Sequence, residues 1–587
     1  MHPRPLRSSR RSLNSPSSLG SLLCAAVLTG ALACTGTTPA VGVPQSQPPR
    51  AEAVPPSIVP QPAYEKALDG PGFTIGRKTP IVVKGHDSDA RKVGGYLARL
   101  LRPATGYDLK VNADGHDRRP AITLDPRGPK SLGKEGYKLT SRADGVRITA
   151  HGAEGLFRGI QTLRQLLPAA VESPTVRRAH WVVAPVRIAD TPRYGYRGTM
   201  LDVARRFYPV ADVKRYIDQA AAYKMNTLHM HLTDDQGWRI AVDAFPELTK
   251  VGASTQSGFT GGSWFYTKAE YQEIVAYAKS RFITVVPEID GPGHTSAALA
   301  SVPGLNCDDK ARPPYSGFDV GISLVCLSDA RHIAKVGDFL TKVMKEVAEL
   351  TPGPYIHVGG DETPQATLDQ YTAYVRAAGS AVKAQGRKTV GWHDLGKGPL
   401  PAGSLLQYWG DDDARATIGT AQESRDILET RQGVAQGASF IMSPADRAYL
   451  DMKYDGATPY GLSWAGYVPV KKAYDWDPTT ATAKLDGTGS VVPADRIAGV
   501  EAPLWADRAY TGSSSLPTSP SQFVAPSVYT DFMAFPRLPA VAEIGWSPKS
   551  THDWTSFSSR LGAQGPRWKA AGIGFYAAPD VPWANEK

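Results

Sequence analysis

The stretch Tyr355-Ile356-His357-Val358-Gly359-Gly360-Asp361-Glu362 decides the fold, because an apolar run ends there in two glycines and two adjacent carboxylates. Proteins of the α/β barrel type place reactive groups in the loops that follow the carboxyl ends of their strands. A buried strand that breaks into glycine and then acid matches this arrangement. We therefore take Asp361 and Glu362 as the candidate catalytic centre and place them at the end of a barrel strand.

Eight short apolar runs, this one included, occur after Thr191-Pro192, and amphipathic helical patterns lie between them. The alternation predicts parallel strands that are joined by helical crossovers. Eight such strands suit a (β/α)8 TIM barrel, which we predict for residues 191–587 as an α/β catalytic domain. The predicted strands are 198–201, 227–232, 283–286, 355–358, 389–392, 404–408, 440–442 and 497–500.

Residues 63–190 show a different pattern, in which short strand-like runs precede a hairpin and a helix. The hairpin is indicated by runs at 137–140 and 146–150, which flank the turn dipeptide Asp144-Gly145. A helical stripe from Leu156 to Leu167 follows. We predict a small α+β domain before the barrel, since a chain of 587 residues is too long for a single core.

The N-terminus has the pattern of an export signal. Four arginines precede a short apolar stretch that ends in Ala31-Leu32-Ala33, which predicts a signal peptide over 1–33 and a secreted, extracellular protein. Cys34 follows directly and resembles a lipoprotein attachment cysteine, so it is a candidate lipid anchor. Residues 34–62 are rich in Pro, Ser and Thr, which predicts a disordered linker. No other stretch is long and apolar enough for a membrane span.

Charge and cysteine content narrow the choice of partners. The formal net charge is +10, but four arginines would leave with the signal and the remaining excess forms no long basic run, so we predict no nucleic-acid partner. Cys307 and Cys326 lie deep in the chain, and after export they would form a disulfide. Two separate buried thiols are the alternative. Neither has a CxxC neighbour, which argues against zinc.

Reactive side chains follow the end of nearly every predicted strand, and carboxylates occur there beside tryptophans. This mixture favours a sugar ligand, because aromatic rings stack on pyranose faces while acids and arginine bind hydroxyls. Glycosidic cleavage commonly uses two carboxyls about 5 Å apart for retention or about 6.5–9.5 Å apart for inversion. Adjacent acids suit neither geometry. The strand-end side chains are Asp202, Arg205, Asp234, Asp235, Trp238, Glu288, Asp290, His294, Asp361, Glu362, Trp392, His393, Trp409, Tyr449, Asp451, Glu501, Trp505 and Asp507.

Several tracts carry a family resemblance through their shared order. They are Leu201-Asp202-Val203-Ala204-Arg205, residues 229–238, Pro287-Glu288-Ile289-Asp290-Gly291-Pro292-Gly293-His294, residues 357–362, Gly391-Trp392-His393, Tyr408-Trp409-Gly410, Tyr449-Leu450-Asp451 and Ala502-Pro503-Leu504-Trp505. Together they resemble the family 20 glycoside hydrolases, the exo-acting β-N-acetylhexosaminidases, from about residue 63 to the C-terminus. Members of that family also carry a small α+β domain before the barrel.

The resemblance implies retaining, substrate-assisted hydrolysis, in which the 2-acetamido oxygen of the sugar attacks the anomeric carbon to form an oxazolinium intermediate. This family is an exception to the scheme with two carboxylates. Glu362 would be the general acid and then the base, and Asp361 would orient the acetamido nitrogen. Tyr449 would donate to the acetamido oxygen. His294 and Asp234 would form a relay to Glu362. The implied substrates are N-acetylglucosamine and N-acetylgalactosamine at the non-reducing ends of chitooligosaccharides or glycans.

The same resemblance implies a binding pocket. Trp392, Trp409 and Trp505 would wall the acetamido group and the terminal sugar, Arg205 would bind ring hydroxyls, and Asp451 would hold the outer hydroxyls. Asp507 stands where relatives usually have Glu, and this shorter side chain leaves the choice between gluco and galacto sugars open.

Some residues have more than one interpretation. His229 and His231 face the same way on one strand and could ligate a metal, although barrel strands often bury such histidines in hydrogen-bonded layers. Glu288 is either a second catalytic acid or a buried partner of Arg205, and Trp464 matches no role. We predict neither metal nor cofactor. There are three alternatives for the whole chain. They are a family relative with altered specificity, which releases a disaccharide or acts on a wall fragment, a sugar-binding protein without turnover, and a metal-dependent hydrolase.

Overall fold

The computed structural model describes residues 57–113, 120–510 and 522–584. The predicted signal peptide, Cys34 and most of the predicted linker lie outside these residues. The folded part begins before the expected linker boundary at residue 62, because Ile58 and Val59 are fully buried. The amide of Val59 donates to Gln165 at 2.9 Å. A short apolar pair in a proline-rich stretch is enough to anchor the chain there. Among the described residues, no helix has both the length and the apolar character needed to cross a membrane.

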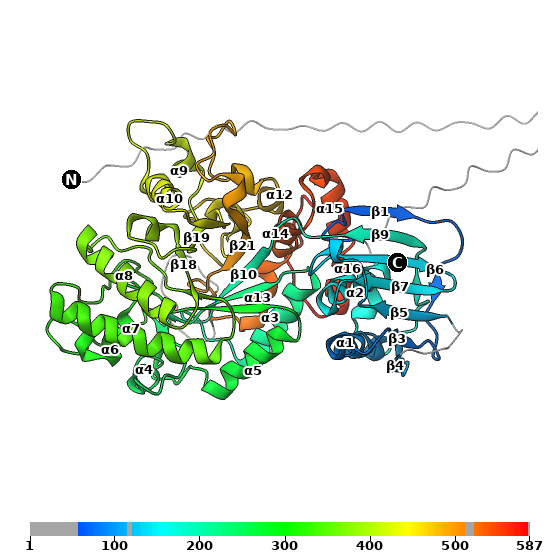
Figure 1. Cartoon of the computed structure of the whole chain (residues 1–587), viewed down its shortest axis with the longest axis horizontal. Coiled ribbons are helices and arrows are strands. Elements are labelled where there is room, and N and C mark those ends of the chain that lie inside the picture. Colours follow the sequence, from blue (N-terminus) through cyan, green and yellow to red (C-terminus); the bar gives the residue numbers. More distant parts are fainter. Residues whose placement is uncertain (1–56, 114–119, 511–521, 585–587) are drawn as a thin grey trace, which may run out of the picture. The chain divides into compact units, whose positions relative to one another are not determined.

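The small domain is a mixed sheet with two helices on one face (Figure 1). Helices α1 (Ser88–Thr105) and α2 (Ala153–Leu166) pack on the face that carries Leu139, Val146 and Ile148. The predicted hairpin is β6 (Tyr137–Arg142) paired with β7 (Gly145–Ala150), and Arg142 pairs with Gly145 across its turn. In spatial order the sheet strands are β1 (Tyr64–Ala67), β9 (Val186–Asp190), β6 (Tyr137–Arg142), β7 (Gly145–Ala150), β5 (Ala121–Asp125), β3 (Ile81–Val83) and β4 (Val111–Ala113).

The second sheet is a closed barrel of parallel strands, as the sequence predicts, and its spatial order follows the chain. Each predicted apolar run coincides with one strand, because strands that are buried on both faces read as continuous apolar segments. The strands are β10 (Tyr196–Asp202), β11 (Thr227–His231), β16 (Thr284–Glu288), β17 (Tyr355–His357), β18 (Lys388–Trp392), β19 (Leu405–Tyr408), β20 (Ser439–Met442) and β21 (Ile497–Leu504).

Amphipathic helices connect the strands and cover the outside of the barrel (Figure 1). Helix α7 (Ala330–Leu350) begins at Asp329, whose carboxylate accepts the amide of His332, and it buries a stripe that contains Val336, Leu340 and Val343. Such a cap satisfies one of the free amides of the first turn. Helix α8 (Leu368–Ala384) begins with a reciprocal capping box. The other large helices are α3 (Val210–Ala222), α5 (Lys268–Lys279), α10 (Arg425–Ala435) and α14 (Arg537–Trp546).

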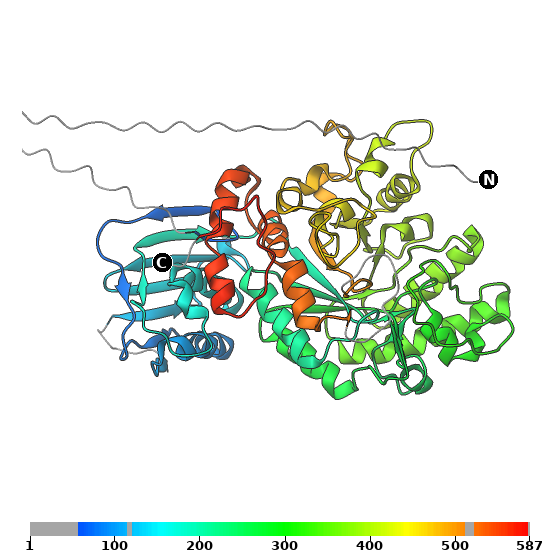
Figure 2. The same cartoon turned by 180° about the vertical axis from the view of Figure 1, so that it is seen from behind.

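The described residues from 57 to 584 belong to one compact unit, within which the small sheet and the barrel share buried charges. The ammonium of Lys224 lies 2.9 Å from the Asp190 carboxylate, and both side chains are fully buried. The C-terminal helices lie beside the small domain (Figure 2), and Arg567 in α16 (Gly565–Ala570) donates to the carbonyl of Gln165 at 2.6 Å. Replacing either Lys224 or Asp190 would be costly, because the remaining buried charge would be left unpaired.

The loop between β16 and β17 contains the disulfide. Cys307 and Cys326 are bonded, with their Cα atoms 5.0 Å apart, which confirms the predicted pair. The amide of Val325 beside it donates to the carbonyl of Pro292 at 3.0 Å. The disulfide therefore holds this long loop against the tract that leads to His294.

Candidate active site

A cavity of about 500 Å³ opens at the carboxyl ends of the barrel strands. Nine of the side chains proposed for the site line it: Arg205, His294, Asp361, Glu362, Trp409, Tyr449, Asp451, Trp505 and Asp507. Phe318, Val320, Leu462, Trp464 and Arg508 complete the lining. The lining residues come from loops that follow several different strands, as the barrel geometry requires.

The turn after β17 aims the two adjacent acids into this cavity. Gly359 and Gly360 have φ values of +67° and +117°, which favour glycine. A Cβ atom on Gly359 would lie 1.5 Å from Oδ1 of Asp290, so no other residue fits there. Glu362 itself has a φ of +47°. A non-glycine residue in this region costs about 1–3 kcal/mol, and such strain is characteristic of functional sites.

Glu362 is connected to a buried acid through a histidine. Nε2 of His294 lies 3.3 Å from Oε2 of Glu362, while its Nδ1 donates to Oδ1 of Asp234 at 3.2 Å. Burial lowers the pKa of His294, but the carboxylates of Asp234 and Asp361 outweigh it and hold that pKa well above its ordinary value. The raised pKa favours the imidazolium form of His294, whose Nε2 lies within ion-pair distance of Glu362.

Asp361 lies beside Glu362, in an environment that disfavours the negative charge of Asp361. Its side chain is only 13% exposed, and burial raises its pKa to about 7. The carboxylates of Asp394 and Glu362 act in the same direction, whereas His294 opposes them. Within the described part of the chain, Oδ1 of Asp361 has no hydrogen-bond partner. This oxygen can accept an N–H group from a ligand.

Aromatic rings form one wall of the cavity. Trp409 is fixed by its Nε1, which donates to Asp394 at 3.0 Å. The ring of Tyr449 lies 6.3 Å from that of Trp505 and 6.0 Å from that of Trp464. Burial, together with the charge of Asp451, keeps the pKa of Tyr449 well above its ordinary value. The hydroxyl of Tyr449 therefore remains a donor.

Charged side chains also line the cavity. Arg205 lies 2.8 Å from Asp234 and 3.1 Å from Asp507, and its guanidinium stacks over Trp505. The two carboxylate oxygens of Asp451 are buried and have no partner among the described residues. Burial and the nearby Asp507 raise the pKa of Asp451 well above its ordinary value. Unpaired oxygens facing a cavity can bind hydroxyl groups.

Comparison with known proteins agrees with this arrangement. The model of the glycosyl hydrolase family 20 catalytic domain matches residues 194–373 and 364–549, and that of domain 2 of the same family matches residues 55–191. A β-N-acetylhexosaminidase from Cellulomonas fimi is 36% identical over 90% of this chain and 97% of its own length. The chain belongs to glycosyl hydrolase family 20. It is therefore a glycoside hydrolase.

Solved structures are similar to this family 20 hydrolase over nearly their whole length. The β-N-acetylhexosaminidase from Streptomyces coelicolor A3(2) has a TM-score of 0.80 and 46% identity, covering 91% of this chain and 100% of that one. The N-acetyl-β-hexosaminidase from Streptomyces plicatus, in complex with thio-NAglucal, has a TM-score of 0.80 and 48% identity, covering 92% and 99%. A mutant of the S. plicatus enzyme is in complex with the product GlcNAc.

Two of the predicted site residues of this family 20 hydrolase lie below the cavity. Trp392 is 1% exposed, and its ring packs 5.6 Å from that of Trp505, so it supports the wall and does not line the cavity. Asp234 is also buried and reaches the cavity only through His294 and Arg205. Sequence position alone does not separate a lining residue from one that lies a layer deeper.

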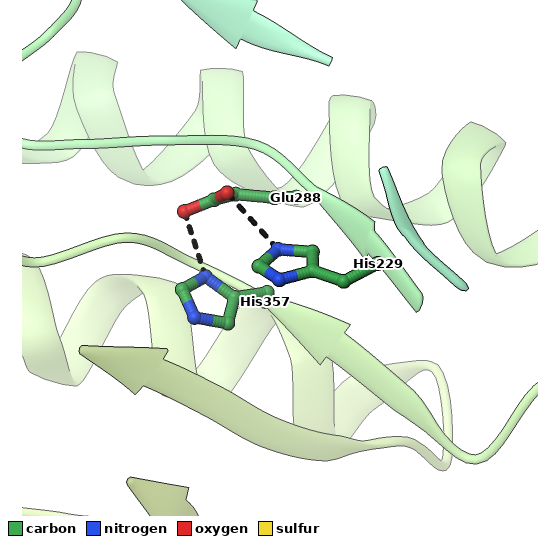
Figure 3. Close-up of side chains that lie close together, drawn as sticks. All are labelled: His229, Glu288 and His357. Atoms are coloured by element: carbon green, nitrogen blue, oxygen red, sulfur yellow. Dashed lines mark ion pairs between the residues drawn. The ribbon is translucent and has the colours of Figure 1, made fainter. Parts of the chain in front are cut away.

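Glu288 and Glu501 differ from the sequence interpretation. Both are fully buried inside the barrel, because β16 and β21 continue further than predicted and direct these side chains inward. Arg205 pairs with aspartates, so the expected pairing of Glu288 with Arg205 is wrong. Glu288 instead contacts His229 and His357 (Figure 3), and it also contacts His231. Glu288 does not line the cavity, which argues against a second catalytic acid.

Residues that could hold a metal ion occur in the same region. His229, Glu288 and His357 have ligand atoms close together, as do His393, Asp394 and Glu429. In the first group the two ring nitrogens of His229 face the carboxylates of Glu288 and Glu501. Burial lowers the pKa of His229, but the two carboxylates outweigh burial and raise that pKa to about 9. The contacts of this group form a hydrogen-bonded layer in the barrel interior, which is the alternative that the sequence offers to a metal site.

Trp464 is one of the five lining residues that sequence reasoning missed. It lines the cavity, is 53% exposed and contacts the rings of Trp409 and Tyr449 edge-on. It lies on an irregular loop, where no periodicity marks a functional side chain. Its position on the same β20–β21 connection as Tyr449 was the signal available.

Proposed function

We propose that this family 20 hydrolase is an exo-acting, retaining β-N-acetylhexosaminidase that removes terminal non-reducing N-acetylglucosamine, and also N-acetylgalactosamine, from chitooligosaccharides or glycans. One observation carries the proposal: the carboxyl of Glu362, an acceptor oxygen of Asp361 and the hydroxyl of Tyr449 face one cavity. A 2-acetamido group has one N–H donor and one carbonyl acceptor, which these last two groups match. The names of the C. fimi and Streptomyces relatives support this activity.

The cleavage step requires one proton and one nucleophile. Glu362 donates its proton to the glycosidic oxygen while the acetamido carbonyl oxygen attacks the anomeric carbon, so the bond to the leaving sugar breaks and an oxazolinium forms. Asp361 accepts the acetamido N–H and stabilises the positive charge that develops on it. Tyr449 donates to the acetamido oxygen and orients it for attack.

The second step returns the enzyme to its starting state. Glu362, now a carboxylate, removes a proton from water, whose oxygen attacks the anomeric carbon on the face that the leaving sugar vacated. The acetamido group is restored, and two displacements at one carbon retain its configuration. The imidazolium of His294, 3.3 Å away, stabilises the carboxylate form of Glu362 between the two steps.

The shape of the cavity supports action at a chain end. A volume of about 500 Å³ suits one terminal sugar together with part of the next. Asp507 is engaged by Arg205 at 3.1 Å, so contacts with the outer hydroxyls fall mainly to Asp451. We propose that this carboxylate, whose two oxygens are free within the described ranges of the chain, accepts hydroxyls of both configurations at C4. Trp464, exposed at the cavity, would stack on the leaving sugar.

A pair of chromogenic substrates tests the proposed function. Aryl β-glycosides of N-acetylglucosamine and of glucose differ at C2, where only the first carries the nucleophile. We expect turnover of the first and a rate near background for the second. Comparable rates for both would contradict the substrate-assisted mechanism, and loss of activity with a chelator would indicate a metal-dependent hydrolase instead.

We also propose that the protein is exported and cleaved before Cys34. The export pattern of residues 1–33 supports this, as does the disulfide, which persists in oxidising compartments. Mass spectrometry of the mature N-terminus tests it. A diacylglycerol-modified Cys34 would establish a lipid anchor, and an intact residue 1 would contradict export through this signal.

A further inference from the structure

A chain of buried ionisable groups continues from the active site into the barrel. Below His294, Asp234 accepts a hydrogen bond from Nε2 of His231 at 2.7 Å. Nδ1 of His231 donates in turn to Oε2 of Glu288. Glu288 is fully buried and reaches no part of the cavity. Four contacts therefore connect Glu362 to a carboxylate in the barrel interior.

Glu288 is the point where three histidines meet. Besides His231, Nε2 of His229 lies 3.0 Å from Oε2, and Nδ1 of His357 lies 2.8 Å from Oε1 (Figure 3). His229 continues to Glu501, which accepts its Nδ1–H at 2.9 Å and the hydroxyl of Tyr196 at 2.6 Å. Barrel interiors are usually filled with branched apolar side chains. An interior built from charges here needs a reason other than packing.

The contacts fix the charge state of His231. Each of its nitrogens donates to a carboxylate, which only the doubly protonated ring can do. Burial opposes this charge, but Glu288 and Asp234 outweigh burial and raise the pKa of His231 well above its ordinary value. His231 in turn helps to hold the pKa of Asp234 well below normal, together with Arg205 and His294, although burial opposes this.

We propose that Glu288 is a positioning residue for the general acid and acts on Glu362 through His231, Asp234 and His294. The inference rests on the role proposed for Glu362. Glu288 keeps His231 charged, and His231, together with Arg205, keeps Asp234 ionised. An ionised Asp234 holds the ring of His294, whose Nε2 lies 3.3 Å from Glu362. Proton delivery to the leaving group then depends on a residue that touches neither substrate nor reacting atoms.

The test separates proton delivery from folding. Glu288→Gln keeps the shape of the side chain but removes its charge. Leaving groups that depart without protonation do not need the general acid, whereas poor ones do. We expect Glu288→Gln to reduce kcat/KM for an N-acetylglucosaminide with a poor leaving group about tenfold more than for one with an activated aryl leaving group, equivalent to about 1.4 kcal/mol. Most of the loss should be in kcat.

Two control variants and one substitute variant make the result unambiguous. Glu543→Gln removes another buried carboxylate, paired with Arg560 at 2.6 Å outside the cavity and the histidine chain, and should show equal factors for both substrates. Glu362→Gln should show the leaving-group dependence more strongly than Glu288→Gln. If Glu288→Gln does not fold, His231→Gln breaks the same chain one contact closer to Glu362.

The outcomes are distinct. If Glu288→Gln lowers kcat/KM equally for both substrates, Glu288 has a merely structural role and the inference is overturned. Unchanged rates would also overturn it. The same criteria apply to His231→Gln where that variant replaces Glu288→Gln. If Glu362→Gln itself shows no leaving-group dependence, the proposed function fails and the inference fails with it. Leaving-group dependence in both Glu288→Gln and Glu362→Gln, but not in Glu543→Gln, would establish the positioning role.

Discussion

Asp361 leads to the most specific prediction, because its raised pKa falls in an accessible pH range. The mechanism needs the ionised form to accept the acetamido N–H. With a pKa of about 7 in the free enzyme, only about a tenth of the molecules would be ionised at pH 6. We therefore expect kcat/KM to fall about tenfold for each pH unit below this value.

The bound enzyme should behave differently. The acetamido N–H donates to Asp361 in the complex, and a hydrogen bond to the charged form lowers a carboxyl pKa. The acidic limb of kcat should consequently lie at lower pH than that of kcat/KM. The difference between about 7 and the ordinary aspartate value of 3.8 corresponds to about 4 kcal/mol of disfavoured charge, which the substrate can partly relieve.

Initial rates with a chromogenic N-acetylglucosaminide between pH 4 and 9 provide the assay, with preincubation at each pH as the control for unfolding. Asp361→Asn should lose most of its activity together with this limb. A carboxyl whose folded pKa exceeds its unfolded one stabilises the fold at low pH and loses that contribution as pH rises through about 7. Asp361→Asn should thus raise the melting temperature at pH 8. A flat kcat/KM between pH 5 and 7 would refute the reasoning.

Three further substitutions test separate parts of the account. Tyr449→Phe should retain the ring, which packs against Trp464 and Trp505, and lose about 2.7–4 kcal/mol of transition-state stabilisation, measured as kcat/KM; a negligible loss would remove its role. Trp464→Ala should reduce kcat/KM for chitobiose by about 0.5–1.5 kcal/mol and leave aryl monosaccharides nearly unaffected, whereas equal losses would argue against stacking on the leaving sugar. Cys307→Ser should lower the free energy of unfolding by about 3 kcal/mol in denaturant titrations, and unchanged stability would contradict a structural disulfide.

The barrel could be predicted from the sequence because its strands are buried on both faces and read as apolar runs, and 355–358 is typical of them. The cavity side chains could be predicted because strand ends converge on one face of such a barrel. Depth could not. Trp392 and Glu288 occupy strand ends as Asp361 does, yet the pleat and the exact end of the strand direct them below the cavity. Trp464 lies on a loop, whose course depends on tertiary contacts that the local sequence does not encode.

The sequence also did not predict that the first described residues are folded. Ile58 and Val59 lie in a stretch whose composition predicts disorder, and only the groove that receives them makes burial favourable. The charged barrel interior is a related case. The alternation of His229 and His231 indicates a shared face, but their carboxylate partners come from strands distant in the sequence.

The central claim is that the sugar supplies its own nucleophile, and a series of substrates with increasingly fluorinated N-acetyl groups tests it most directly. Each fluorine withdraws electron density from the carbonyl oxygen and changes the size of the group little. We predict that kcat/KM falls steeply from the acetyl to the trifluoroacetyl substrate, with retention of configuration at the anomeric carbon. Rates that do not depend on fluorination, or a glycosyl group trapped on a side chain during turnover, would contradict the account.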